Sequence, residues 1–220
     1  MNIKLQQFIQ IMLMWSLEIP VCKTNQLVSI EKNTAVKWYL RFREICSWKL
    51  SQNPIRIGGP SKICQIDETL ISKRKYHRGR FIEERWVFGG IDTETKLGFM
   101  EFVPDRSAAT LLNVIEKYII PGSIIYSDSW RAYSRIDQIP VVPRYEHYTV
   151  NHKRYFVDPI TGVHTNSIEN MWKNAKHKFK AMAGVHSHML QSYIDEFLWR
   201  QRFGTDAFDN IMLHIEEKFT

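Results

Sequence analysis

Two aspartates and a glutamate occupy positions in the sequence where metal-dependent chemistry is expected. Asp67 lies on the apolar run 63–69, Asp128 ends the apolar run 124–128, and Glu169 lies in the first turn of a predicted helix. A carboxylate on a buried strand is unfavourable unless an opposite charge compensates it. Two divalent cations roughly 4 Å apart would do so, and they can hold the attacking and leaving oxygens of a phosphodiester. The pattern therefore predicts a two-metal phosphoryl-transfer site.

The third ligand of this site has two candidates on the helix predicted at 166–182. At about 100° per residue, one apolar stripe of this helix should face a sheet. Its members are Ile168, Met171, Trp172, Ala175, Phe179 and Met182. Glu169 and Lys176 lie about 100° and 80° from Ile168, at the margin of the stripe, whereas Asn166 lies about 160° away. A carboxylate also suits a hard cation better than an amide does, so Glu169 is preferred over Asn166.

Each of these residues also has an ordinary structural interpretation. Asp128 can cap a helix that starts at Ser129, Glu169 can interact with its helix dipole, and Asn166 can cap the same helix. Asp128 and Glu169 are separated by 40 residues (129–168), and Asp128 and Asn166 by 37 (129–165), so the spacing does not choose between them. Three further acids are expected to be structural. Glu68 alternates with Asp67 and so should face away from the site, Asp92 ends a strand of the hairpin, and Asp105 precedes a helix capped by Ser107.

The periodic patterns also predict the elements that must position these residues. Strands are predicted at 63–71, 85–92, 96–104, 123–128 and 145–150, with a hairpin turn at 93–95. Helices are predicted at 107–118, 130–136, 166–182 and 187–203. The predicted order is that of an α/β fold of the ribonuclease-H-like class: three strands, a helix, a strand, a helix, a strand and a helix. It places Asp67 on the first strand and Asp128 at the end of the fourth.

Residues 1–50 are predicted to form a separate helical unit. An apolar helical period from 5 to 17 ends at Pro20, a short helix can follow at 23–30, and Asn33 or Thr34 can cap a third helix that runs to residue 46. In a helix-turn-helix unit, basic residues of such a helix meet DNA and its apolar residues pack inward. The basic residues are Lys37, Arg41 and Arg43, and the apolar residues are Val36, Tyr39 and Leu40. A plain three-helix cap explains the pattern equally well.

Composition and breaker residues set the remaining limits. The segment 51–62 is rich in Ser, Asn, Gly and Pro, which predicts a linker before a catalytic domain at 63–205 and a helical tail at 206–220. The formal net charge of +7 suits a polyanionic partner. Three scattered cysteines exclude a disulfide framework and favour a reducing compartment. The apolar run 8–19 is too short and too polar to span a bilayer, so no membrane partner is expected.

Two groups of basic residues flank the predicted site. The first follows the first predicted strand, and the second lies on the helix that carries Glu169. Their members are Lys73, Arg74, Lys75, Arg78 and Arg80 in the first group, and Lys173 and Lys176 in the second. They are candidate phosphate contacts, although the first group is also compatible with a solvated loop or a nuclear localisation signal. His147, His152 and His164 are expected to be structural, with a zinc site as the weaker alternative.

Short segments in a fixed order resemble Merlin-type DDE transposases and their bacterial ISXO2-like relatives. The segments are IGGP at 57–60, IDET at 66–69, KRKYHRGR at 73–80, WVFGG at 86–90, DRSA at 105–108, SDSWRAY at 127–133, VNH at 150–152, FVDP at 156–159 and HTNSIE at 164–169. The resemblance covers about two thirds of the chain. It implies a ribonuclease-H-like core, two Mg²⁺ or Mn²⁺ ions held by Asp67, Asp128 and Glu169, and a DNA-binding unit before the core.

The same resemblance implies a basic residue seven positions after the third ligand. This sequence contains both versions, Asn166 with Lys173 and Glu169 with Lys176, so both remain catalytic candidates. The implied activity is hydrolysis of a phosphodiester at each end of a transposable element, followed by strand transfer to target DNA. The implied partners are double-stranded DNA, both terminal inverted repeats and target, and further copies of the chain in a homodimer or larger assembly.

Two alternatives to this activity stay open. One is a host-adopted or decayed transposase that binds DNA without cutting it, and the other is a structure-selective nuclease built on the same core. The expected location is the nucleus in a eukaryotic host, and otherwise the cytoplasm or nucleoid.

Overall fold

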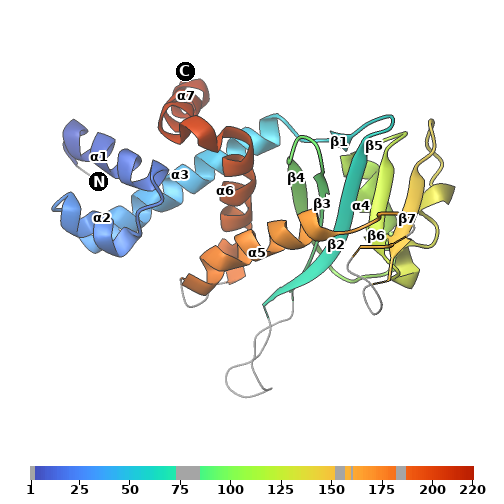
Figure 1. Cartoon of the computed structure of the whole chain (residues 1–220). Helices are drawn as coiled ribbons and strands as arrows, with labels where there is room; N and C mark the ends of the chain where they lie inside the picture. The colour runs from blue at the N-terminus through green and yellow to red at the C-terminus, as the bar shows by residue number, and fades with distance from the viewer. Residues whose placement is uncertain (1–2, 73–84, 152–156, 160, 182–186) are drawn as a thin grey trace, which may run out of the picture. The chain divides into compact units, whose positions relative to one another are not determined.

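The computed structural model describes residues 3–72, 85–151, 157–159, 161–181 and 187–220 (Figure 1). The chain forms two compact units. One consists of Met1–Pro54 together with Val185–Thr220, and the other of Ile55–Gly184. The first is built of helices and the second is an α/β unit, so each is described by itself.

A five-stranded mixed sheet forms the centre of the α/β unit. Its strands are β2 (Ile63–Ser72), β3 (Arg85–Asp92), β4 (Gly98–Val103), β6 (Ile124–Asp128) and β7 (Glu146–Val150), in the order β4-β3-β2-β6-β7. β3 is antiparallel to both β2 and β4, whereas β6 is parallel to β2 and β7 is parallel to β6. This order and these directions are those of a ribonuclease-H-like fold, so the predicted fold class is confirmed.

One face of the sheet packs on helix α4 (Ala108–Tyr118). Alternate residues of β2, Cys64 and Ile66, are fully buried there in one cluster with Leu111 and Ile115 of α4. Ser107 caps α4 as predicted, since its side chain accepts a hydrogen bond from the Thr110 N–H at 3.3 Å. The period-2 pattern of β2 thus assigns its even-numbered residues to the α4 face.

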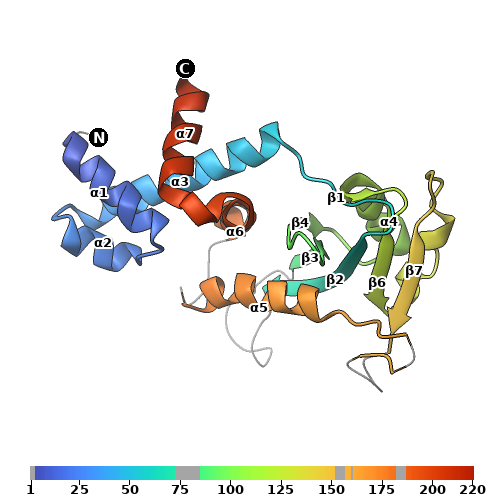
Figure 2. The ribbon, with the colours of Figure 1, turned by 45° about the horizontal axis from the view of Figure 1, so that its top comes forward.

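Helix α5 (Asn166–Ala181) packs on the opposite face, along β2 and β3, as Figures 1 and 2 both show. Four members of the predicted apolar stripe are buried there, whereas Phe179 is half-buried and Met182 lies outside the described residues. Ile168, Met171, Trp172 and Ala175 are each no more than 5% exposed. Two glycines allow the close approach, because a Cβ atom at Gly89 would lie 2.6 Å from the Trp172 ring and one at Gly98 would lie 2.8 Å from the Met171 sulfur.

Smaller elements complete the α/β unit. β1 (Ile57–Gly58) and β5 (Ile119–Ile120) form a two-stranded parallel pair. Two short 3-10 turns, η1 (Arg131–Tyr133) and η2 (Ile136–Gln138), occupy the place of the helix predicted at 130–136. The predicted hairpin joins β3 to β4, and Asp92 shapes it by accepting the N–H groups of Glu94 and Thr95 at 2.8 and 3.0 Å.

In the part of the helical unit that the structure describes, five α-helices come from both segments of the chain. They are α1 (Leu5–Ser16), α2 (Val21–Leu27), α3 (Lys32–Gln52), α6 (Leu190–Phe203) and α7 (Ala207–Phe219), with the short turns η3 (Ser187–Met189) and η4 (Gly204–Asp206) beside α6. One buried cluster joins Trp15 of α1, Phe42 of α3, Trp199 of α6 and Ile211 of α7. No helix among the described residues is long and apolar enough to cross a membrane.

This shared core corrects the predicted boundaries. Residues 1–50, the end of the predicted 63–205 domain and the predicted tail at 206–220 pack together in one unit. The physical reason is that α6 buries Trp199 against Trp15 and α3, with the two indole centroids 5.6 Å apart. α3 continues six residues beyond Cys46 to Gln52, so the predicted linker is shorter than 51–62.

Helix α3 also corrects the predicted orientation of its side chains. Its buried positions include Ala35, Tyr39 and Phe42, which turns Val36 outward to 42% exposure. Arg43 falls on the inner face and is only 3% exposed, with its guanidinium 4.1 Å from the Tyr193 ring centroid. The exposure predicted for Val36 and Arg43 is therefore wrong.

The predicted start of α3 is wrong as well. The helix begins at Lys32, and Glu31 holds the N-cap position in place of Asn33 or Thr34. Lys37 and Arg41 are exposed, as DNA contacts require.

Candidate active site

Three polar residues alternate along β2 on the face that carries α5. They are Gln65, Asp67 and Thr69, and Gln65 is fully buried. The Gln65 side-chain oxygen accepts the backbone N–H groups of Ser167 and Ile168 at 2.8 and 3.2 Å. These N–H groups belong to the first turn of α5, which has no partners for them within the helix. Gln65 therefore fixes the start of α5 on the sheet.

The other two residues of this row contact α5 further along its length. The Trp172 indole N–H donates to Asp67 Oδ2 at 3.1 Å, and the Lys176 ammonium donates to the Thr69 hydroxyl. A step of two residues along a strand covers about 6.6 Å, and a step of four residues along a helix covers about 6 Å. Every second residue of β2 can therefore contact every fourth residue of α5. Strand and helix are thus held in a fixed register around Asp67.

Asp128 lies on the neighbouring strand beside Asp67. The parallel register pairs Gln65 with Tyr126, and extending it by two residues places Asp67 opposite Asp128. Side chains opposite each other in a sheet project from the same face, so both carboxylates face α5. Asp128 Oδ1 accepts the Trp130 N–H at 2.9 Å. Asp128 therefore forms a turn with Trp130, and the helix predicted to start at Ser129 is replaced by η1, which starts at Arg131.

The charges around Asp67 are unfavourable for an isolated carboxylate. Burial, together with the nearby Glu68 and Asp128 carboxylates, raises the pKa of Asp67 to about 7. Burial lowers the pKa of Lys176, and the Asp67 carboxylate acts in the opposite direction. A buried acid beside two other acids is typical of a place where a cation is needed.

Glu169 is exposed in the first turn of α5, where its Oε1 accepts the Thr165 hydroxyl at 3.0 Å. It lies about 20° from Lys176 around the helix. On the same helix, Met171 lies over β4 and Trp172 lies over β3. Glu169 and Lys176 therefore project from the other side of the helix, toward β6. Among the described residues no three His, Cys, Asp or Glu side chains lie close enough to hold a metal. The structure brings Asp67 and Asp128 together, and the predicted group of three with Glu169 is not formed.

Asn166 is exposed at the first residue of α5. Its backbone N–H donates to His164 Nδ1 at 3.4 Å. The next two N–H groups are taken by Gln65, so the helix cap predicted from Asn166 is supplied by β2. Around the helix Asn166 lies about 60° further from the sheet than Glu169.

Gln65 is the residue of this site that sequence reasoning missed. Its Nε2 lies 3.1 Å from His164 Nδ1, so it links the loop before α5 as well as the helix itself. The signal was present, because polar residues at 65, 67 and 69 alternate with apolar or outward-facing ones. A criterion based on acidic ligands does not include an amide such as that of Gln65.

The remaining acids are structural, as predicted. Glu68 faces away from α5 and pairs with Arg106 at 3.3 Å, and it also accepts the Tyr133 hydroxyl. Asp92 shapes the hairpin, and Asp105 Oδ1 accepts the Ser107 N–H at 2.8 Å beside the start of α4.

The histidines show no metal-binding arrangement within the described segments. His147 lies 2.8 Å from the Ser127 hydroxyl, and burial lowers its pKa. His152 lies outside the described residues. Lys173 is exposed and Lys176 is half-buried. The first basic group, Lys73, Arg74, Lys75, Arg78 and Arg80, also lies outside the described residues.

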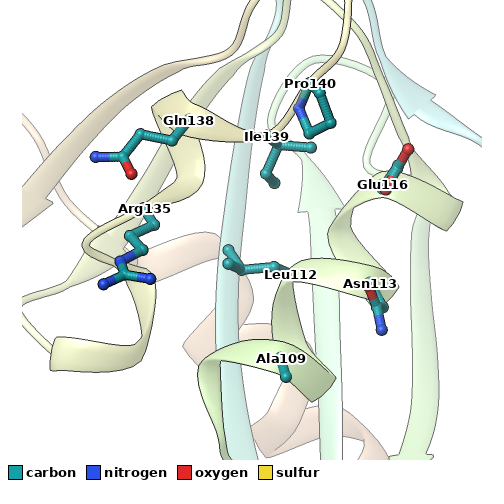
Figure 3. Close-up of a pocket in the computed structure, with 8 residues that line it drawn as sticks. All are labelled: Ala109, Leu112, Asn113, Glu116, Arg135, Gln138, Ile139 and Pro140. Atoms are coloured by element: carbon teal, nitrogen blue, oxygen red, sulfur yellow. The ribbon is translucent and has the colours of Figure 1, made fainter.

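A cavity of about 330 Å³ lies between α4 and the segment at η2 (Figure 3). Leu112 and Ile139 line it, with Glu116 and Arg135 at its margin. It belongs to the α4 side of the unit and contains none of the candidate ligands.

Comparisons with known proteins bear on this arrangement. A model of the ISXO2-like transposase domain matches residues 61–202, more than half of the chain. The chain belongs to the ISXO2-like transposase family. It is 32% identical over 98 residues to an uncharacterized transposase-like protein of Haemophilus influenzae, and the match covers 44% of this chain and 75% of that protein.

Two retroviral integrase structures resemble the transposase. The catalytic core domain of BIV integrase is 13% identical, with a TM-score of 0.46, over 73% of this chain and 99% of that one. The HTLV-2 integrase catalytic core domain in complex with magnesium is 14% identical, with a TM-score of 0.39, over 64% of this chain and 84% of that one. The fold assignment rests on the strand order described above.

Proposed function

We propose that this transposase is a DDE-type enzyme that hydrolyses a phosphodiester at each end of a transposable element and then joins the freed end to target DNA. The observation that carries the proposal is the placement of Asp67 opposite Asp128 on the face covered by α5, where their charges oppose each other. Family membership makes DNA the expected substrate.

The donor set fits divalent magnesium or manganese. Asp67 and Asp128 would supply hard oxygen ligands, and the raised pKa of Asp67 supports a role for added positive charge at this place. Glu169 is the proposed third ligand, because it shares its stripe with Lys176 and a side-chain rotation would release it from Thr165. Two such ions, when bound, activate the attacking oxygen and stabilise the leaving oxygen.

The protein's own groups position this chemistry. The Trp172 N–H holds the Asp67 carboxylate, Gln65 fixes the first turn of α5 that carries Glu169, and the Lys176 ammonium offers a positive charge to a phosphate. Asn166 remains the alternative catalytic residue.

Double-stranded DNA is the proposed partner, through basic groups in both units. Lys37 and Arg41 of α3 are proposed to contact the terminal repeat, and Lys173 with the basic group at 73–80 to contact phosphates nearer the reaction. Because two element ends react together, we propose a homodimer or larger assembly. The proposed location is that of the host DNA, in a nucleus or a nucleoid.

The proposal is tested with a duplex that carries the terminal repeat found beside the coding sequence. Cleavage should require Mg²⁺ or Mn²⁺ and should be lost in Asp67→Asn and Asp128→Asn, because an amide binds a hard cation poorly. Glu116→Gln, an exposed acid on α4, is the matched control and should cleave normally. Cleavage that persists in excess EDTA would exclude the two-metal mechanism.

The same duplex tests the role of the helical unit. Lys37→Ala combined with Arg41→Ala should reduce the preference for the terminal repeat over random DNA. Loss of phosphate contacts alone would weaken both equally and lower the salt dependence. A wild-type protein that binds the repeat tightly and does not cut it would instead support the DNA-binding alternative.

A further inference from the structure

An exposed tryptophan stands beside the candidate active site, and the chemistry above makes no use of it. Trp130 is 42% exposed, whereas Trp172 on the other face of the sheet is 5% exposed. A single exposed aromatic side chain is common on protein surfaces. Trp130 differs because its backbone N–H is bound to Asp128 Oδ1 at 2.9 Å. The ring is therefore carried by the turn that holds a proposed metal ligand.

A cation is held against this ring by side chains from other elements. The Arg106 guanidinium carbon lies 4.9 Å from the Trp130 ring centroid and 3.9 Å from that of Trp86, at the start of β3. Arg106 Nη1 also lies 3.3 Å from Glu68 Oε1. Trp86, Arg106 and Trp130 thus form a row in which the arginine is fixed between two rings.

This row has the composition of a nucleobase-stacking site. An indole face stacks on any base, and an arginine beside it contributes a cation–π interaction and attracts the phosphate of the same nucleotide. An apolar protein partner has no use for the positive charge of Arg106. The backbone hydrogen bond to Asp128 keeps the turn that carries the ring at the end of β6, next to the proposed metal ligand.

We propose that Trp130, together with Arg106, binds one unpaired nucleobase of the DNA strand next to the phosphate that reacts. This proposal rests on the proposed function, because the DNA strand that supplies the base is the one expected to react at Asp67 and Asp128. A base inside a duplex cannot stack on a protein ring until it leaves its pair. The strand is therefore locally unpaired at this position.

Abasic substitution tests the proposal by binding alone. Duplexes carry the terminal repeat with a single abasic site placed in turn at each nucleotide beside the cleavage position. At one position, loss of the base should weaken binding by the wild-type protein about 5- to 150-fold, the range for one stacked base. In Trp130→Ala that base should no longer matter, whereas Trp130→Phe should keep most of its effect. Phe219→Ala, which removes an aromatic side chain that is 76% exposed, is the matched control.

The outcomes separate this proposal from the proposed function. The same binding series is repeated in the Asp67→Asn protein, which is expected to bind and not to cut. Coupling between Trp130 and one base, together with a wild-type protein that does not cleave the duplex with Mg²⁺ or Mn²⁺ present, would support the stacking site and remove the cleavage proposal. Cleavage without that coupling, with equal abasic effects in wild type and Trp130→Ala at every position, would overturn the stacking site and leave the row available for a protein partner.

Discussion

The helical unit and the α/β unit differ in the partners that surround a carboxylate removed from solvent. In the helical unit Glu196 is 2% exposed and pairs with Arg200 at 3.1 Å. Arg200 also donates to the backbone oxygens of Trp15 and Ser16 at 2.8 and 3.2 Å. In the α/β unit the half-buried Asp67 accepts an indole N–H and lies near two other acids. Buried charges with opposite partners maintain a fold, whereas like charges gathered around one carboxylate indicate a binding site.

This difference predicts opposite effects of mutation. Removing one partner of a buried ion pair leaves an unpaired charge and is strongly destabilising. Neutralising one of several like charges relieves repulsion and stabilises the fold while it removes function. The predictions below test the comparison from the largest expected effect to the smallest.

The largest effect is expected at the third ligand. Glu169→Gln should reduce cleavage on the order of 10³-fold and leave DNA binding unchanged, because the amide cannot neutralise a divalent ion. Asn166→Ala should cleave nearly as well as wild type, since Gln65 supplies the cap of α5. Single-turnover cleavage of the terminal-repeat duplex measures both. A dead Asn166→Ala beside an active Glu169→Gln would move the ligand to Asn166 and its basic partner to Lys173.

The paired charge of the helical unit should show the largest loss of stability. Arg200→Met removes the cation that lies 3.1 Å from the buried Glu196 carboxylate and the donor to the Trp15 and Ser16 oxygens, and we expect the free energy of unfolding to fall by about 3–5 kcal/mol. Urea denaturation followed by circular dichroism measures the change. Lys37→Met, an exposed residue on α3, should change stability by less than about 0.5 kcal/mol. Equal stability of Arg200→Met and wild type would contradict the comparison.

The unpaired carboxylate should behave in the opposite way. The pKa of Asp67 is about 7 in the folded protein and about 3.9 when unfolded. Below pH 4 the group is protonated in both states, and as the pH rises from 4 to 7 the unfolded chain ionises first, so the folded state loses stability. In EDTA, Asp67→Asn should therefore be more stable than wild type by about 2–4 kcal/mol at pH 8. The advantage should disappear at pH 4; a less stable Asp67→Asn at pH 8 would refute the unpaired state.

The smallest effect concerns Gln65. Gln65→Met keeps the side-chain volume but leaves two N–H groups of α5 without their acceptor, which should cost about 1–3 kcal/mol. If Gln65 only stabilises the fold, kcat at low temperature should be unchanged. If it positions Glu169, kcat should fall several-fold in folded protein, and Gln65→Glu should restore part of it because a carboxylate also accepts both N–H groups. Unchanged kcat in both variants would limit Gln65 to stability.

Much of the α/β unit was predictable, because its signals are local. The period-2 pattern of β2 and the 3.6-residue period of α5 assign each residue to a face without reference to partners. The same patterns failed for α6, since an apolar stripe shows that a helix is buried and does not show what covers it. Trp199 finds Trp15 across more than 180 residues of sequence, and no local period contains that pairing.

The site divides in the same way. Asp67 and Asp128 follow from the patterns of their two strands, whereas the position of the Glu169 carboxylate depends on a side-chain rotation toward Thr165 that no pattern encodes. Arg43 lies on the inner face of α3, whereas its charge predicts an exposed position. Its burial depends on Tyr193, whose position is set by α6.

The helical unit is built from two segments that precede and follow the α/β unit in the sequence, which has a consequence for folding during translation. Ribosomes release the chain from its N-terminus at about 5–20 residues per second. Residues 55–184 are complete before α6 and α7 are translated, so the sheet and its acidic residues can fold while α1 to α3 still lack Trp199 and Ile211. The first helices made are among the last to acquire their core. During translation the aromatic side chains of α1 to α3 thus stay exposed until α6 and α7 follow, which gives chaperones that bind apolar segments time to act on them.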